Sequence, residues 1–288
     1  MNMMSETAIG IILALIGALI NNFGVVLQKR QVNLKAPPKE LEKSMKDIYQ
    51  FLKDPLWVLG ILMQTIFYLP FLIIAYDLIK ITLLQPISSA GIIFLVLGLV
   101  WLVNEKLRGR FEYLGLGILI FGVIIISFGG VVGETTLYGF LSSASSFWII
   151  FAVILASSLL FLIPILKIKK TQLIFLGFLI GNCYAFVSIS MQIFTLALMD
   201  LNHPLGGWLL AAGILGAIVG TVFGVLAAQE AFKRGQAIYV IPFTQISMNL
   251  IPILTGLLVF EQIIMAPFFF WIGVISIVVG ASFLARFQ

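Results

Sequence analysis

The segment AYDLIKITLLQP (residues 75–86) returns in altered form as AFKRGQAIYVIP (residues 231–242). Alanine and proline are 11 positions apart in both segments, and each proline is followed 19 residues later by a glutamate, Glu105 or Glu261. Each segment joins one hydrophobic run to the next, and the copies start at positions 75 and 231, which is an offset of 156 in a chain of 288 residues. This pattern predicts an internal duplication.

The composition is that of a chain embedded in lipid. Hydrophobic residues make up 61% of the chain and charged residues only 10%, whereas a soluble domain keeps about 25% of its residues charged. The net charge of +5 lies beside hydrophobic runs, which argues against a nucleic-acid partner. A single cysteine, Cys183, and a single histidine, His203, exclude an internal disulfide and a metal site built from several such residues.

Nine hydrophobic runs are long enough to cross a bilayer, which takes about 20 apolar residues in a helix. Helices are expected because lipid cannot hydrogen-bond an open backbone. The runs cover residues 8–29, 56–78, 81–104, 111–131, 147–166, 171–199, 206–232, 238–260 and 266–286. We therefore predict an all-α integral membrane protein with nine transmembrane helices.

The basic residues set the orientation, because Lys and Arg collect on the cytoplasmic side of a membrane. With nine crossings, sixteen of the seventeen basic residues, beginning with Lys29 at the end of the first run, fall on one side, and Lys80 alone falls on the other. We expect the N-terminus outside and the C-terminus in the cytoplasm, in a cell membrane (plasma or inner membrane). Residues 38–54 combine apolar residues at helical spacing with lysines, which predicts an amphipathic helix on the cytoplasmic leaflet; an ordinary solvated loop is the alternative.

The two repeats are expected to have opposite orientations. Equivalent elements lie five crossings apart, and an odd number of crossings inverts one copy relative to the other. The first repeat, residues 1–132, holds four helices and the amphipathic segment, and the second, residues 133–288, holds five helices. Inverted repeats are a recurring plan of secondary transporters, which bind substrate near the bilayer midplane between the repeats and work by alternating access.

Three segments resemble a known family. They are AYDLIKITLLQP, the helix end NEKL (residues 104–107) and NNFGVVLQKR (residues 21–30). They are similar to segments of the NIPA-type magnesium transporter family, a nine-helix branch of the drug/metabolite transporter superfamily. The resemblance covers nearly the whole chain in topology and implies a transporter fold with a central cavity, and Mg²⁺ as one candidate cargo. The family commonly has a glutamate in the body of the second helix, where this chain has Leu69.

Polar side chains within the hydrophobic runs are the candidates for substrate binding. Such side chains are costly at membrane depth, so each needs a partner or a function. Several share helix faces, and we expect them to converge on the cavity; because Asn, Gln and Ser also join membrane helices to one another, packing is the alternative for each. The candidates are Asn21, Asn22, Gln28, Gln64, Tyr68, Ser88, Ser89, Gln245 and Asn249.

The residue types leave the cargo open. The acidic residues fall near the ends of runs, whereas Mg²⁺ is usually held by one or two carboxylates and water. We predict a secondary transporter of a small solute or cation, with Mg²⁺ or another divalent cation as one cargo. Export of a neutral or zwitterionic metabolite or drug is an alternative, and a lipid flippase or scramblase is an alternative of another class. The sequence has no catalytic constellation and no Walker A motif, so we expect no enzyme activity and no cofactor; membrane lipids are the expected neighbours, and a homodimer is left open.

Overall fold

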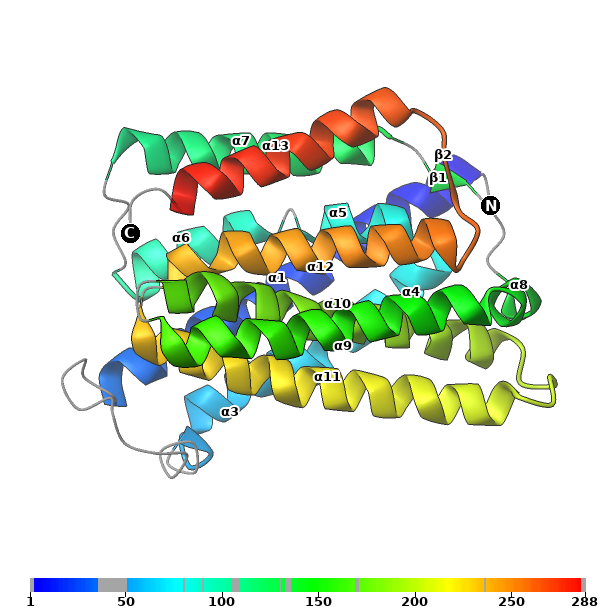
Figure 1. Cartoon of the computed structure of the whole chain (residues 1–288), viewed down its shortest axis with the longest axis horizontal. Coiled ribbons are helices and arrows are strands. Elements are labelled where there is room, and N and C mark those ends of the chain that lie inside the picture. Colours follow the sequence, from blue (N-terminus) through cyan, green and yellow to red (C-terminus); the bar gives the residue numbers. More distant parts are fainter. Residues whose placement is uncertain are drawn as a thin grey trace.

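A computed structural model describes residues 3–35, 51–79, 81–89, 91–104, 109–129, 131–132, 136–168, 171–235 and 237–285. These residues are almost entirely helical, and most of the helices run along one common axis (Figure 1). Helix α1 begins near one end of the bundle, and α13 ends at the opposite one. The predicted amphipathic segment lies outside the described residues except for positions 51–54.

Apart from two short strands, the elements of the described residues are helices. In chain order they are α1 (Met3–Lys35), α3 (Pro55–Leu62), the π-helix η1 (Met63–Phe67), α4 (Leu69–Leu78), α5 (Ile81–Ser89), α6 (Ile92–Leu102), α7 (Arg110–Ser127), β1 (Val131–Val132), α8 (Leu137–Ser142), α9 (Ala144–Lys167), α10 (Gln172–Met199), α11 (Gly206–Arg234), α12 (Ala237–Leu258), β2 (Ile263–Ile264) and α13 (Pro267–Ala285). The strands β1 and β2 pair antiparallel, with Val131 opposite Ile264.

Five helical stretches are long and apolar enough to cross a bilayer, as expected for a multi-pass membrane protein. Within the described residues they are Ala8–Leu34, Pro55–Tyr76, Ala144–Lys167, Gln172–Met199 and Gly206–Arg234. Tyr113–Gly122, Phe243–Leu258 and Pro267–Ser276 are shorter apolar helices. The predicted run 81–104 is divided into α5 and α6 on either side of Gly91. The four predicted crossings that do not coincide with one of the five long stretches stay predictions.

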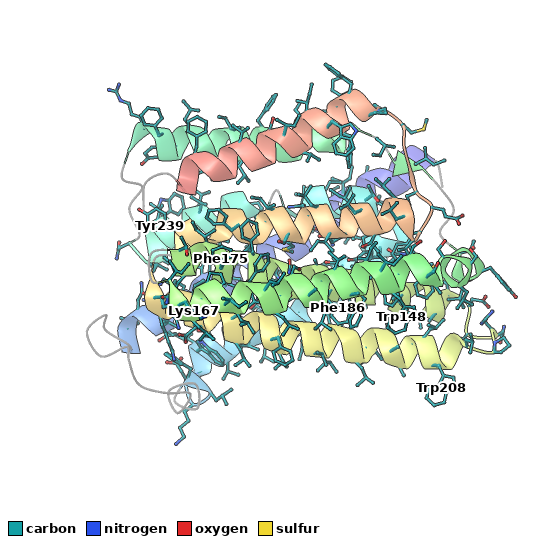
Figure 2. All side chains as sticks on the ribbon, viewed as in Figure 1. Trp148, Lys167, Phe175, Phe186, Trp208 and Tyr239 are labelled. Carbon is teal, nitrogen blue, oxygen red and sulfur yellow. The ribbon has the colours of Figure 1, made fainter. Side chains whose placement is uncertain are left out.

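The outer faces of α9 and α11 carry large apolar side chains. Leu159, Ile218 and Phe223 are all exposed, which is unfavourable in water but favourable against lipid tails. Trp148 and Trp208 lie towards one end of the bundle, and Lys167 lies at the other end of α9 (Figure 2). The 19 residues from Trp148 to Lys167 rise by about 29 Å, close to the roughly 30 Å of a hydrocarbon core, and tryptophan is typical of its edges.

Glycines let the helices approach closely. A Cβ atom added at Gly220 of α11 would lie 2.9 Å from the Cys183 carbonyl oxygen of α10, and one added at Gly224 would lie 2.8 Å from the Tyr184 ring. A Cβ atom at Gly60 of α3 would lie 2.7 Å from the Gly24 carbonyl oxygen of α1. No larger residue fits at these positions, which is the small-residue packing expected between membrane helices.

The helix that carries Gln64 is not uniform. After α3 the chain forms the π-helix η1, and α4 then opens with Pro70 in its first turn, where the missing N–H costs little. A π-helical turn contains more residues than an α-helical one. Gln64 and Tyr68 are four positions apart, which places two side chains on one face of an α-helix, and the π-helix changes that register.

Buried apolar residues form two main clusters that follow one another along the bundle. One contains Val26 and Ile180, and the other contains Ala14 and Ile189. Helices α1, α9 and α10 contribute buried residues to both clusters.

Candidate functional site

A cavity of about 120 Å³ lies inside the bundle, with walls from α1, the α3–η1–α4 stretch, α5, α6, α10, α11 and α12. One enclosed water needs roughly 10–15 Å³ on this scale, so the cavity has room for several waters or for a small organic molecule. Seven of the nine candidates line it: Asn21, Asn22, Gln28, Gln64, Tyr68, Ser88 and Gln245. The described lining side chains are all uncharged.

The other two candidates are placed differently. Asn249 is almost fully buried, and its Nδ2 donates to the backbone oxygen (2.8 Å) and to the side-chain Oε1 (3.2 Å) of Gln245, one turn earlier in α12. Asn249 is not among the lining residues, but it orients Gln245, which is. Ser89 belongs to α5, and its side chain lies outside the described part of the structure.

Three buried glutamines from separate helices form a hydrogen-bonded row, which we call the amide chain (Gln28, Gln64 and Gln229). Gln229 Nε2 donates to Gln28 Oε1 and Gln28 Nε2 donates to Gln64 Oε1, both at 2.7 Å. Gln64 Nε2 then donates to the Tyr184 hydroxyl at 2.6 Å, and Trp57 Nε1 donates to Gln229 Oε1 at 3.3 Å. Gln28 and Gln229 are each 1% exposed. The row links α1, η1, α10 and α11 through saturated amides, which avoids the cost of burying unpaired polar groups.

The beginning of this row is fixed by a helix cap. The Asp54 carboxylate accepts hydrogen bonds from the backbone N–H groups of Leu56 (2.9 Å) and Trp57 (3.0 Å), and Pro55 follows as the first helical residue of α3. Both features favour a helix start at this point. Trp57 is also stacked on Phe51, with ring centroids 6.0 Å apart, so its indole N–H is held towards Gln229.

Lys29 lies next to the amide chain and connects α1 to the end of α11. Its Nζ donates to the carbonyl oxygens of Phe232 and Gly235, both at 2.7 Å, and lies 5.5 Å from the centroid of the Phe232 ring. The last carbonyls of a helix lack intrahelical partners and carry the negative end of its dipole. We refer to this part of the cavity, with the amide chain, as the Lys29 end.

The placement of Lys29 corrects the sequence interpretation. We ended the first run at this residue and assigned it to a cytoplasmic loop, but α1 continues to Lys35 and Lys29 is 2% exposed. The charge is accommodated because the end of α11, some 200 residues later in the chain, supplies carbonyl oxygens to it.

The opposite end of the cavity, which we call the Tyr76 end, is centred on Tyr76, Gln85, Ser88 and Ser188. The Tyr76 hydroxyl donates to the Ser188 carbonyl oxygen of α10 at 3.2 Å and accepts from Gln85 Nε2 at 3.3 Å. Gln85 Oε1 and Ser88 Oγ are buried and have no hydrogen-bond partner in the described part of the chain. Both residues line the cavity.

Several of these residues were missed from the sequence. Tyr184 and Gln85 line the cavity, and Gln229 completes the amide chain. Each is a polar residue inside a hydrophobic run, which is the same signal that singled out Gln64. A polar residue inside a hydrophobic run does not by itself indicate whether its side chain faces the centre of the bundle.

Other polar residues in the runs join helices away from the cavity. Asn182 Nδ2 of α10 donates to the hydroxyls of Ser157 (2.9 Å) and Ser158 (3.1 Å) of α9. Thr82 Oγ1 donates to Gln262 Oε1 in a short hydrogen bond. Within the described residues, no group of three or more His, Cys, Asp and Glu side chains is placed to hold a metal ion.

Comparison of the chain with protein-family models, with curated proteins and with solved structures found no match.

Proposed function

We propose that the protein is a secondary membrane transporter that moves a small uncharged solute through its central cavity by alternating access. The observation that carries this proposal is the cavity itself. Its walls come from both halves of the chain, and its described lining consists of amides, hydroxyls, aromatic rings and aliphatic side chains. A site of this kind at the centre of a lipid-exposed bundle is where transporters bind their cargo.

Nine crossings in two inverted repeats of drug/metabolite transporter type are the proposed architecture. The helix packing supports it: α1 packs on the α3–η1–α4 stretch and on α5–α6, while α10 packs in the same way on α11 and α12. Helices α7 and α13, which end the first repeat and the second, pack on each other (Figure 1). Helices α6 and α12, equivalent in this scheme, are each followed closely by a residue with positive φ, Asn104 (57°) and Glu261 (52°).

The proposed orientation has the N-terminus outside and the Lys29 end of the cavity towards the cytoplasm, in a cell membrane. Lys167, Lys233 and Arg234 lie in the last turns of α9 and α11, at the end of the bundle where α13 also ends (Figure 1). Basic residues favour the cytoplasmic side.

An uncharged cargo fits the cavity better than Mg²⁺ does. A dehydrated divalent ion needs carboxylate ligands, and no described lining side chain carries one. A charge buried among neutral groups is strongly disfavoured, whereas amides and hydroxyls suit a neutral polar molecule. Mg²⁺ transport is therefore an outcome that the experiment below tests separately.

The test uses the purified protein in proteoliposomes. Uptake is measured with radiolabelled glycerol, urea and acetamide, and Mg²⁺ entry is measured with an entrapped fluorescent indicator. We expect saturable uptake of a neutral probe, which Asn21→Leu abolishes without changing the amount of protein in the membrane. Mg²⁺ entry alone would make the protein a cation carrier, and movement of fluorescent lipid without solute uptake would make it a flippase or scramblase.

A second measurement tests alternating access without depending on the choice of solute. Thr244 lines the cavity, and Cys183 is the only cysteine of the sequence. Thr244→Cys in a Cys183→Ser background should react with a membrane-impermeant thiol reagent added to either side of the membrane. Reaction from neither side, or from one side only, would contradict the proposed mechanism.

A further inference from the structure

The Tyr76 end of the cavity contains two buried oxygens that the protein leaves without a hydrogen bond. Gln85 is 3% exposed, and its Oε1 has no partner in the described part of the chain; the same holds for Ser88 Oγ. The two residues are three positions apart in α5 and therefore lie on the same face of the helix. Buried polar atoms nearly always have a partner, so this pair is unusual.

The hydrogen bonds around Tyr76 determine which atom of Gln85 is left over. A phenol has one proton, and Tyr76 donates it to the Ser188 carbonyl oxygen. Tyr76 can then only accept from Gln85, so the amide nitrogen of Gln85 must face the hydroxyl, as it does at 3.3 Å. The atom left without a partner is consequently the amide oxygen, which can only accept a hydrogen bond.

The cavity that contains this pair also has apolar walls. Leu72, Leu95, Val187 and Met248 line the same cavity, and no described lining side chain is charged. An ammonium group would find no counter-ion in this lining and is therefore disfavoured. A molecule with an apolar body suits the apolar walls, and its neutral N–H or O–H group can donate to the two oxygens without needing a counter-ion.

We propose that Gln85 Oε1 and Ser88 Oγ form a subsite for the hydrogen-bond donor of the transported solute, an uncharged amphipathic molecule that ends in a primary amide or a hydroxyl. This proposal rests on the proposed transport function and specifies its substrate class. The donor group points towards the Tyr76 end, and the apolar body of the solute fills the cavity towards the amide chain. In the amide chain, by contrast, the side-chain oxygens of Gln28 and Gln64 already accept hydrogen bonds from neighbouring glutamines.

The test compares two benzamides, one with an N–H donor and a larger one in which two methyl groups replace the N–H hydrogens. Benzamide carries an amide NH₂ group, and N,N-dimethylbenzamide has the same ring and carbonyl group without an N–H. Binding is measured by the shift in the melting temperature of the purified protein in detergent, and by protection of Thr244→Cys, in the Cys183→Ser background, from thiol labelling. We expect the apparent Kd for N,N-dimethylbenzamide to be higher by about tenfold, because it leaves the buried oxygens without a donor.

Two leucine variants test whether the difference in apparent Kd between the two probes depends on Gln85. Gln85→Leu should abolish the difference between the two probes. Gln192→Leu is the matched control, because Gln192 is also a buried glutamine whose Oε1 has no partner among the described residues, but it does not line the cavity; this variant should keep the full difference. If Gln85→Leu does not fold, Gln85→Glu supplies the second test, since its carboxylate should add binding of benzylammonium that the parent protein lacks.

The outcomes separate this proposal from the transport function. Equal binding of the two probes, no binding of benzamide, or the same probe difference in the Gln85 and Gln192 variants would overturn the donor subsite. In each of those cases, thiol labelling from both sides of the membrane would still support the proposed transport function. If labelling from both sides failed while the probes were still distinguished in detergent, the binding site would stand and the transport function would fall.

Discussion

The two ends of the cavity are built from the same kinds of side chain but use them differently. At the Lys29 end, three glutamine amides, an indole and a phenol join in one continuous row, and both polar atoms of every amide have a partner. At the Tyr76 end, a glutamine and a serine each keep a buried oxygen without one. A polar network whose atoms have partners holds helices together, whereas buried polar atoms without a protein partner are available to a bound molecule or to water.

This difference assigns different roles to residues of the same type. Gln28 and Gln85 are both buried and both line the cavity. The side-chain oxygen and nitrogen of Gln28 both have partners in the protein, whereas the side-chain oxygen of Gln85 has none among the described residues. We therefore expect substitutions at the Lys29 end to act mainly on stability, and substitutions at the Tyr76 end to act mainly on solute binding.

The largest expected effect is that of Lys29→Met. The variant removes two charge-assisted hydrogen bonds and leaves the buried carbonyl oxygen of Phe232 and the partly buried one of Gly235 without this donor, so we expect a loss of about 3 kcal/mol in unfolding free energy. The measurement is denaturant unfolding of the detergent-solubilised protein. Lys167→Met, at the exposed end of α9, is the control and should change stability little; equal losses in the two variants would contradict the role of Lys29.

The next effect is that of Gln28→Leu, which removes the central member of the amide chain. Gln64 Oε1 and Gln229 Nε2 then lose their partners, and we expect a loss of about 2 kcal/mol. The double variant Gln28→Leu/Gln229→Leu should lose less than the sum of the two single variants, because one interaction is shared between them. Additive losses would show that the chain does not act as a unit.

Asn249→Leu is expected to act on transport through Gln245. Without the hydrogen bond from Asn249 Nδ2 to Gln245 Oε1, the Gln245 side chain is less fixed in the cavity wall. The KM for a transported neutral probe should then rise about fivefold, which corresponds to one neutral hydrogen bond. Radiolabelled uptake in proteoliposomes measures this change. An unchanged KM would mean that Gln245 does not contact the solute or does not need Asn249.

The smallest expected effect on stability is that of Tyr76→Phe. It removes two long neutral hydrogen bonds, one donated to the Ser188 carbonyl oxygen and one accepted from Gln85 Nε2, so the loss should be about 1 kcal/mol. The same unfolding experiment that is used for Lys29→Met measures it. A loss of unfolding free energy as large as that of Lys29→Met would contradict the different roles of the Lys29 end and the Tyr76 end.

The sequence was informative about the helices because lipid imposes strong rules on a chain. Five of the hydrophobic runs overlap the observed long helices. Polar residues inside the runs led to Asn21, Gln64 and Gln245, all of which line the cavity. The rules apply to single helices, however. They do not predict contacts between helices, such as the hydrogen bond of Gln64 with Gln28 or those of Asn182 with two serines of α9.

The features that the sequence did not predict depend on contacts between distant helices or on local irregularity. Lys29 looked like a loop residue because the carbonyls that accept its hydrogen bonds lie in α11. The π-helix around Gln64 has no simple sequence signal, since Pro70 follows it and is compatible with an ordinary helix start. Asn249 satisfied the pattern of a cavity residue but bonds within its own helix.

The two hydrogen bonds from Lys29 to Phe232 and Gly235 are made to main-chain oxygens at the end of α11. Every amino acid supplies such an oxygen, so replacing the residue at position 232 or 235 changes the side chain but keeps the acceptor. At position 29 only a long side chain with a terminal cation keeps the donor. The two partners of one contact should therefore differ widely in mutational tolerance: a saturation scan should accept many residues at position 235 and very few at position 29.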